Sequence, residues 1–260
     1  MVTDALDDYY QKYKGLYKSK SQLIRVISEN WFKDHMYCPF CTEDRIITFN
    51  NNHPVADFFC DQCNEQFQLK SKKLKFGNAI TDGEYNKMME AIYSNSVPNL
   101  ILMSYSSSYD FIYDLLIIPK EFILPGIIQK RKPLSLKAKR SGWTGCNIIL
   151  KNIPDAGKVF AIKGKNVIDK KEVREKVAKI AFYRKMKEIE GRGWISDVLN
   201  VISNIKKDVF ELDDVYNYAT FLKNLHPNNN NIEAKIRQQL QILRDNGIIE
   251  FLGRGRYKKI

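Results

Sequence analysis

The sequence has no apolar run long enough to span a bilayer, because its best candidate, Phe111 to Pro119, is broken by Asp114. Residues 1–10 also lack the apolar core of a signal peptide, so we expect a soluble cytoplasmic protein without a membrane partner. Its three histidines form no H-E-x-x-H pair or triad pattern, and there is no G-x-x-x-x-G-K loop. These absences argue against a zincin-type protease, a triad hydrolase and a P-loop nucleotidase.

Acidic residues are also in the minority: 30 Asp and Glu stand against 42 Lys and Arg, for a net charge of +12. A basic balance of this size favours a polyanionic partner, with nucleic acid ahead of a membrane surface. A basic protein without such a partner remains the alternative. A chain of 260 residues can bury two cores, and we expect one domain over residues 1–189 and a smaller one over 190–260.

Cysteine is scarce, but four of the five cysteines form two C-x-x-C pairs: Cys38 with Cys41, and Cys60 with Cys63. Two such pairs at this interval are typical of a closed structural zinc site. The alternatives are two disulfides or four reduced core thiols, and nothing in the sequence indicates the oxidising compartment that disulfides need. The fifth, Cys146, is most simply a buried thiol.

Polar residues are interleaved with the second cysteine pair. Residues 54–59 and 67–70 have the character of strands, so the pair would sit at the tip of a hairpin. The period of two places Gln68 and Lys70 on one strand face, and Asp57 faces them if the register is right. A carboxylate, an amide and a lysine in this order are typical of the PD-(D/E)xK nucleases, although an ordinary polar strand face would give the same letters.

The remainder of the N-terminal part predicts an α/β sandwich. We expect one or two helices within residues 1–33, a helix over 82–93 and strands over 99–105 and 111–118. A hairpin over 159–168 and a charged helix over 170–187 follow. The glycine-bearing residues 190–193 are interpreted as a domain linker.

Two basic stretches could contact phosphates. Lys72 and Lys73 belong to a short lysine run after the hairpin, and residues 129–140, which end at Arg140, carry six positive charges. Trp143 follows between two glycines, where it could be an exposed wedge against DNA or a core residue at a strand start.

The C-terminal part has the order of a winged helix: helices over 194–205, 212–225 and 232–245, then a hairpin over 248–260. The third helix would enter the major groove, and the wing would lie along a DNA backbone. The residues that we expect at DNA are Asn230, Asn231, Lys235, Gln238 and Gln239 on or before that helix, and Arg254 and Arg256 on the wing.

Several stretches together resemble the DpnI-like methyl-directed (type IIM) restriction endonucleases: residues 54–60, 67–73, 127–134, 141–148, 236–245 and 253–257. The resemblance spans nearly the whole chain in matching order. It implies an α+β PD-(D/E)xK core with structural Zn²⁺, a C-terminal winged helix, and Mg²⁺-dependent cleavage of double-stranded DNA at GATC sites with N6-methyladenine. It also implies a bacterial enzyme, which we expect to be a monomer, and a methyl-sensing role for Trp143.

The sequence departs from that family at one catalytic position, because the residue aligned with the second carboxylate is Gln68. By the resemblance, Asp57 and Gln68 bind Mg²⁺ and Lys70 assists the attacking water. An amide can donate an oxygen to Mg²⁺ but brings no negative charge. Gln68 is a working natural variant, an inactivating change, or a loss that Glu65 partly compensates, although the odd spacing places Glu65 on the other strand face.

Three hypotheses therefore remain: a metal-dependent endonuclease, a reader of methylated DNA that is inactive because of Gln68, and a regulator with a zinc ribbon and a winged helix. The Asp57–Lys70 pair discriminates the first two from the third, because a regulator has no need for both residues on facing strands.

Overall fold

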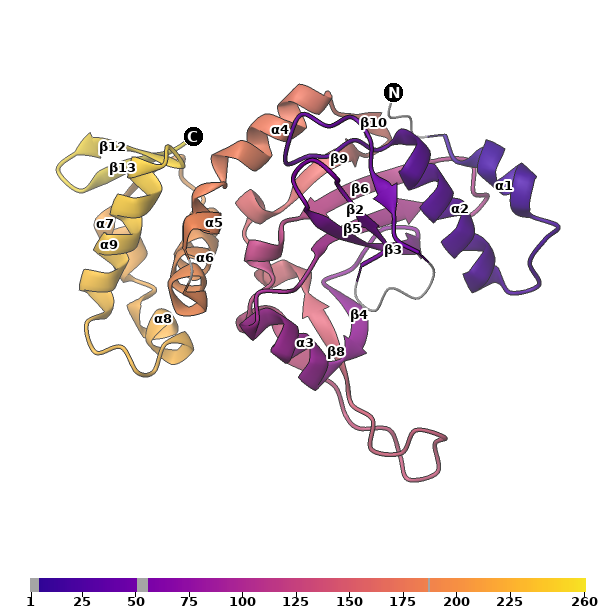
Figure 1. The fold of residues 1–260 in the computed structure, drawn as a ribbon. Coiled ribbons are helices and arrows are strands. Elements are labelled where there is room, and N and C mark those ends of the chain that lie inside the picture. The colour runs from indigo at the N-terminus through magenta and orange to yellow at the C-terminus, as the bar shows by residue number, and fades with distance from the viewer. Residues whose placement is uncertain (1–4, 51–55, 187) are drawn as a thin grey trace.

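The computed structural model describes residues 5–50, 56–186 and 188–260. A seven-stranded sheet in the order β1-β2-β3-β5-β6-β9-β10 lies at the centre of the N-terminal part (Figure 1). β3 and β5 pair in parallel, and the other neighbouring strands pair antiparallel. The strands are β1 (Ile47–Thr48), β2 (Phe58–Phe59), β3 (Gln66–Lys73), β5 (Asn99–Tyr105), β6 (Ile112–Ile118), β9 (Val159–Lys163) and β10 (Asn166–Val167).

This sheet separates two hydrophobic cores. Along β5, Leu100 and Leu102 belong to one core while Ile101 and Met103 belong to the other, as the alternation of strand side chains requires. The second core is covered by α2 (Lys20–His35), α4 (Lys170–Lys179) and the cysteine pairs, with α1 (Asp7–Tyr13) beside α2. The first core is covered by α3 (Tyr85–Tyr93) and by a three-stranded sheet, β4-β8-β7.

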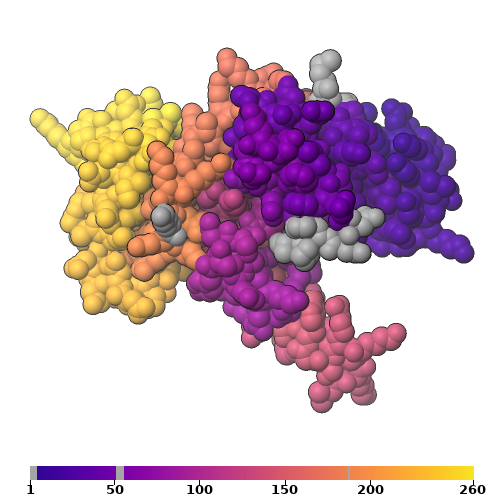
Figure 2. Space-filling model, in the orientation of Figure 1, coloured from indigo at the N-terminus to yellow at the C-terminus, as the bar shows by residue number. Residues whose placement is uncertain are grey.

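That small sheet consists of β4 (Ala79–Glu84), β8 (Gly145–Ile149) and β7 (Ile128–Lys130). Short 3₁₀ turns complete the layer: η1 (Lys120–Phe122), η2 (Pro125–Ile127), η3 (Leu150–Asn152) and η4 (Asp155–Gly157). Between β7 and β8 the chain projects from the body as an arm, which is the pink projection at the bottom of Figure 2. The result is a mixed α+β sandwich, as the sequence predicts.

The central strands match the sequence prediction because the apolar pattern of each segment is enough to specify a buried strand. All seven residues of β5 are buried, and β6 begins within one residue of the expected start. The helix expected from Asp82, however, begins only at Tyr85. Residues 79–84 pair with β8 instead, with an irregularity between Asp82 and Glu84, and the Glu84 side chain then caps α3 by accepting the Asn86 N–H. Pairing with a distant strand overrides the local helical pattern here.

The charged helix expected over 170–187 is also interrupted. α4 ends at Lys179, and a separate short helix, α5, covers Phe182–Lys185. The break allows Phe182 and Tyr183 to pack into the core, where the Tyr183 ring lies 4.5 Å from that of Phe122. Burial of these two large rings outweighs the continuity of the helix.

The C-terminal part holds α6 (Ile189–Asn204), β11 (Val209–Glu211), α7 (Leu212–Tyr216), α8 (Ala219–Leu225), α9 (Ile232–Asp245), β12 (Ile249–Gly253) and β13 (Arg256–Lys259). α9 has the predicted bounds, and Ile236, Leu240 and Leu243 point inward as predicted. The helix expected over 212–225 is broken at Asn217 and Tyr218 into α7 and α8. β11 adds an unexpected third strand, in the order β11-β13-β12.

The interpretation of residues 190–193 as a linker is wrong, because they form part of the first turns of α6. Trp194, fully buried on this helix, belongs to the same core cluster as Leu100 and Leu102 of the large sheet. The N- and C-terminal parts therefore pack against each other through a continuous hydrophobic core. No helix among the described residues is long and apolar enough to cross a membrane.

Candidate metal centre and active site

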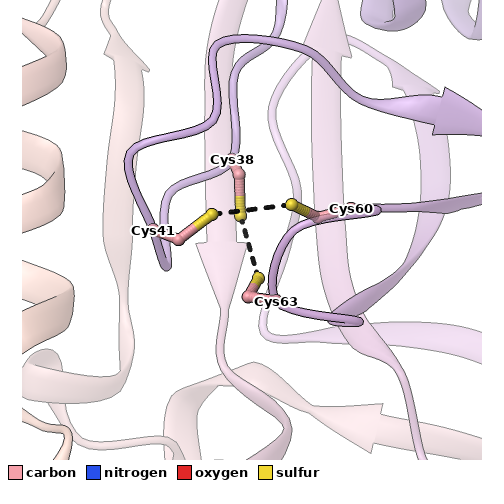
Figure 3. Close-up of side chains that lie close together, drawn as sticks. All are labelled: Cys38, Cys41, Cys60 and Cys63. Atoms are coloured by element: carbon pink, nitrogen blue, oxygen red, sulfur yellow. Dashed lines mark hydrogen bonds between the residues drawn. The ribbon is translucent and has the colours of Figure 1, made fainter.

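The four cysteines of the two C-x-x-C pairs converge at one point (Figure 3). Their sulfur atoms all lie within 4.8 Å of one another, and the Cys38–Cys63 and Cys41–Cys60 sulfurs are each 3.5 Å apart. A disulfide needs about 2.05 Å between its sulfurs, which excludes that alternative in this structure. A tetrahedral zinc site with Zn–S bonds of about 2.3 Å places its sulfurs about 3.8 Å apart. The cluster therefore fits a metal such as zinc.

The surroundings of the sulfurs also suit a metal site. Burial raises the pKa of the Cys38 thiol, so this group would not ionise readily without a cation. Burial opposes ionisation of Cys60 too, but hydrogen bonds from the backbone N–H groups of Cys63 and Gln62 outweigh it and lower the pKa of Cys60. Backbone N–H donors that converge on a sulfur stabilise a thiolate, which is the form that binds metal.

Local turn chemistry builds the second cysteine pair into a hairpin. The Cys60 N–H donates to the Glu65 carbonyl, the Asn64 N–H donates to the Cys60 carbonyl, and Asn64 adopts a φ of 59°, which asparagine tolerates. Near the first cysteine pair, Arg174 of α4 donates to the carbonyls of Cys38 and Glu43. The cluster therefore ties the β2–β3 hairpin, the end of α2 and α4 together.

The hairpin holds Asp57 against residues 67–69 of β3. Phe58 pairs with Phe67 in antiparallel register, the Asp57 N–H donates to the Phe67 carbonyl at 2.9 Å, and the Leu69 N–H donates to Asp57 Oδ2 at 2.8 Å. These two hydrogen bonds place the Asp57 carboxylate at the backbone of Leu69, between Gln68 and Lys70 in the sequence. The sequence predicts a strand over residues 54–59, but β2 covers only Phe58 and Phe59, and Asp57 precedes it. Residues 54 and 55 lie outside the described residues.

Lys70 lies two residues beyond Gln68, on the same face of β3. The flanking Phe67 and Leu69 contact the core under α2, so Gln68 and Lys70 face the opposite layer, where the small sheet packs. Both side chains are half-buried. Gln68 and Lys70 thus present an amide oxygen and an ammonium on one side of β3, and the Asp57 carboxylate is bound to Leu69 between them in the sequence. Carboxylate and amide oxygens are the ligands that hard cations such as Mg²⁺ accept.

The structure adds a residue to this group that sequence reasoning misses. Lys70 Nζ lies 2.8 Å from Oδ1 of Asp82 on β4, and the side chain of Asp82 is 7% exposed. Cys146, buried as expected, pairs with Asp82 across the small sheet, and burial followed by the Asp82 carboxylate raises the pKa of its thiol to about 11. Nothing in the sequence pattern links Asp82 to Lys70, since the two residues meet only where the two sheets pack.

Glu65, the residue considered as a compensation for Gln68, is committed elsewhere. Its carboxylate accepts from Asn99 at 2.7 Å, and it lies 3.1 Å from Lys120 Nζ and 3.5 Å from an Arg184 nitrogen. It is buried in a network that joins the hairpin to β5 and α5. Such a network satisfies both oxygens of Glu65, and we therefore exclude this residue from the candidate active site.

The basic candidates of the N-terminal part are accessible. Lys72 and Lys73 are exposed at the end of β3, and Arg140 is exposed on the arm. Trp143, at the base of the arm, is half-buried: the Arg140 guanidinium lies 4.8 Å from its ring centroid, and its ring covers Gly145 so closely that a Cβ there would lie 2.9 Å from it. Trp143 is therefore neither fully buried nor free of contacts.

The C-terminal candidates divide into accessible and buried groups. Gln239 is 1% exposed and faces the interior of the helical domain, which argues against a base contact, so we leave it out of the proposed interface. Lys235 is half-buried at the start of α9. The other expected residues are exposed on the approach to α9, on its surface or on the β12–β13 wing: Asn230, Asn231, Gln238, Arg254 and Arg256.

Two family models match the chain. Residues 9–186 match the DpnI model, described as the Dam-replacing family, and residues 190–259 match the model of the Dam-replacing HTH domain. The first match alone covers more than half of the chain. The second coincides with the helices and wing of the C-terminal part, and a domain of this type indicates DNA binding.

Proposed function

Because the chain belongs to the Dam-replacing DpnI family, we propose that it cleaves duplex DNA at GATC sites whose adenine carries an N6-methyl group. The family itself implies a methylation-dependent restriction endonuclease. The observation that supports the finer proposal is that the Asp57 carboxylate binds the Leu69 N–H, between Gln68 and Lys70, which share one face of β3. This is the arrangement of a PD-(D/E)xK active site, which we assign to residues 1–189.

In this proposal each side chain has a separate task. Asp57 and Gln68 hold Mg²⁺, which when bound polarises the scissile phosphate. The Leu69 N–H holds the Asp57 carboxylate in place by donating to Oδ2. Lys70, restrained by Asp82, orients the attacking water with its ammonium group. Cys38, Cys41, Cys60 and Cys63 hold Zn²⁺, which has a structural role because four sulfurs leave no open coordination position.

DNA recognition is assigned to both parts of the chain. Residues 190–260 form the winged-helix domain, with α9 in the major groove and Arg254 and Arg256 along the backbone. In the N-terminal part, Trp143 senses the methylated site beside the basic arm, and Lys72 and Lys73 contact phosphates. We further propose a monomeric cytoplasmic bacterial enzyme.

The test is digestion of GATC-containing duplexes, fully methylated beside unmethylated, with Mg²⁺ and then Mn²⁺. The protein and its Gln68→Glu variant are compared. We expect cleavage of the methylated duplex alone by the unaltered protein. Cleavage by Gln68→Glu only would identify this chain as an inactive form of the enzyme, and cleavage of both duplexes alike would contradict methyl dependence.

A second candidate function is favoured by Gln68 itself. A neutral amide in place of a carboxylate lowers the affinity for a hard cation, so the chain could instead be a non-cleaving reader of methylated DNA. Tight binding of the methylated duplex without cleavage by either protein would favour the reader. A zinc-ribbon regulator explains less, since it has no use for Asp57 beside Gln68 and Lys70.

The wing arginines give a separate prediction. The Arg254→Ala/Arg256→Ala double variant should weaken binding and reduce the slope of log affinity against log salt by about 1.8, which is about 0.9 for each phosphate that an arginine no longer neutralises. Fluorescence anisotropy of the methylated duplex from about 50 to 200 mM salt measures the slope. Arg244→Ala is the matched control, because Arg244 pairs with Asp245 at the far end of α9. An unchanged slope in the double variant would argue against a wing on the DNA backbone.

A further inference from the structure

The Asp82 carboxylate is buried beside the candidate active site and only half satisfied. Its Oδ1 accepts from Lys70 Nζ at 2.8 Å and from the Gly83 N–H at 2.7 Å. Its Oδ2 is buried and has no hydrogen-bond partner among the described residues. The side chain as a whole is 7% exposed. Leaving one oxygen of a buried carboxylate without a partner is costly, so Oδ2 is available to bind a ligand.

The position of Asp82 suits that ligand. Asp82 and Gln68 line the same cavity, of about 200 Å³, with Glu84, Leu100, Ile123 and Ile148. Most of the remaining lining is apolar, and its polar side chains come from β3, from β4 and from Lys87 of α3. Two oxygen donors, an amide from Gln68 and a carboxylate from Asp82, therefore line one cavity, as ligands of a hard cation do.

The other acids near this cavity are engaged. The Glu84 carboxylate accepts the Asn86 N–H as the N-terminal cap of α3. Glu65 lies in the network with Asn99, Lys120 and Arg184. Among the described acids at this place, Asp82 is the one whose free oxygen is both buried and unpaired.

We propose that Asp82 is a ligand of the catalytic divalent cation and supplies the negative charge that Gln68 lacks. The inference rests on the proposed function, since it concerns the same site. Asp57 and Gln68 together carry one negative charge, and Asp82 brings the set to two, equal to that of an Asp–Glu pair. Oδ2 binds the cation while Oδ1 keeps its hydrogen bond to Lys70, so one carboxylate joins the metal site to the lysine that orients the water.

Binding of Mn²⁺ to the zinc-loaded full-length protein, measured by isothermal titration calorimetry without DNA, tests this directly. Asp82→Asn preserves shape and should weaken Mn²⁺ binding about tenfold or more. Gln68→Glu should tighten it. The double variant Gln68→Glu/Asp82→Asn should return to within about threefold of the unaltered protein, because a carboxylate at either position restores the same ligand charge. Asp155→Asn, which alters an exposed acid paired with Lys158, should leave binding unchanged.

The variants separate a ligand from a residue that merely positions Lys70. If Asp82→Asn binds Mn²⁺ as tightly as the unaltered protein, the proposal is overturned. It is equally overturned if Asp82→Asn weakens binding and Gln68→Glu fails to restore it, since a positioning role would behave in that way. Should Asp82→Asn not fold, Lys70→Met removes the ion pair and keeps the carboxylate: retained or tighter Mn²⁺ binding supports a ligand, and abolished binding contradicts it.

Asp57→Asn distinguishes failure of this inference from failure of the proposed function. Loss of Mn²⁺ binding in Asp57→Asn with unchanged binding in Asp82→Asn would leave the active site in place and remove only Asp82 from it. Unchanged binding in both variants would mean that the cation site has been misassigned altogether. Weakened binding in both, with rescue by Gln68→Glu, supports the site and the role of Asp82 together.

Discussion

Replacing Asp57 by alanine should reduce DNA cleavage by at least about a thousandfold, or about 4 kcal/mol in the activation barrier, while methylated DNA is still bound. Asp57 is the acidic member of the proposed catalytic group, and its carboxylate accepts the Leu69 N–H beside Gln68. In the proposed mechanism the cation then loses a charged ligand, and the phosphate is no longer polarised. Single-turnover cleavage measures the first effect, and anisotropy without added Mg²⁺ measures the second.

Alanine also removes the acceptor for the Leu69 N–H, so a loss of activity could follow from damage to the hairpin. Asp57→Asn is the matched control, because the amide oxygen can still accept from Leu69 while the charge is gone. We expect the asparagine variant to melt at the temperature of the unaltered protein and to be as inactive as the alanine variant. Full cleavage activity in Asp57→Asn would refute the assignment of this residue as a metal ligand.

Removing the metal from the cysteine cluster should unfold the hairpin and with it the candidate active site. Structural zinc contributes about 10–16 kcal/mol of apparent binding free energy in small zinc domains, which is comparable with the whole stability of a domain, about 5–15 kcal/mol. Cys60 directly follows β2, and Asp57 lies three residues before it. Metal loss should therefore abolish cleavage as well as the cooperative thermal transition of the N-terminal part.

The measurement combines metal analysis with thermal unfolding followed by near-ultraviolet circular dichroism. Cys60→Ser should contain no stoichiometric zinc and lose its native aromatic signal. Cys146→Ser is the control, because Cys146 is buried but lies outside the cluster, and it should keep one zinc ion per chain. A Cys60→Ser protein that folds and cleaves without zinc would show that the cluster is dispensable.

Much of the fold follows from local patterns. The apolar run 99–105 becomes β5 and the periodic run 232–245 becomes α9, because each pattern is satisfied by burial of that segment alone. The predictions fail where a distant segment competes. Residues 82–84 join β8 instead of starting a helix, and residues 190–193 continue α6 because Trp194 packs into the shared core. A single sequence contains no signal for these partners.

The candidate site also has some features that local patterns predict and others that they do not. The cysteine spacing predicts a cluster that could hold zinc, and the structure confirms that the four sulfurs converge. The strand period predicts that Gln68 and Lys70 share a face, and the hairpin brings the Asp57 carboxylate to the Leu69 N–H between them. The roles of these three side chains remain predictions. Gln239 has the polarity of a DNA contact, yet it lies on the inner side of α9, where the helix packs.

The sequence by itself determined the features that depend on short spacings: the two C-x-x-C pairs, the hairpin that carries Gln68 and Lys70, and the order of the C-terminal helices and wing. Only the tertiary structure decided which charges meet. Asp82 reaches Lys70 because the small sheet packs across the large one, and Glu65 is removed from the site by Lys120 and Arg184. These pairings arise from the packing of segments far apart in the chain, and no local period encodes them.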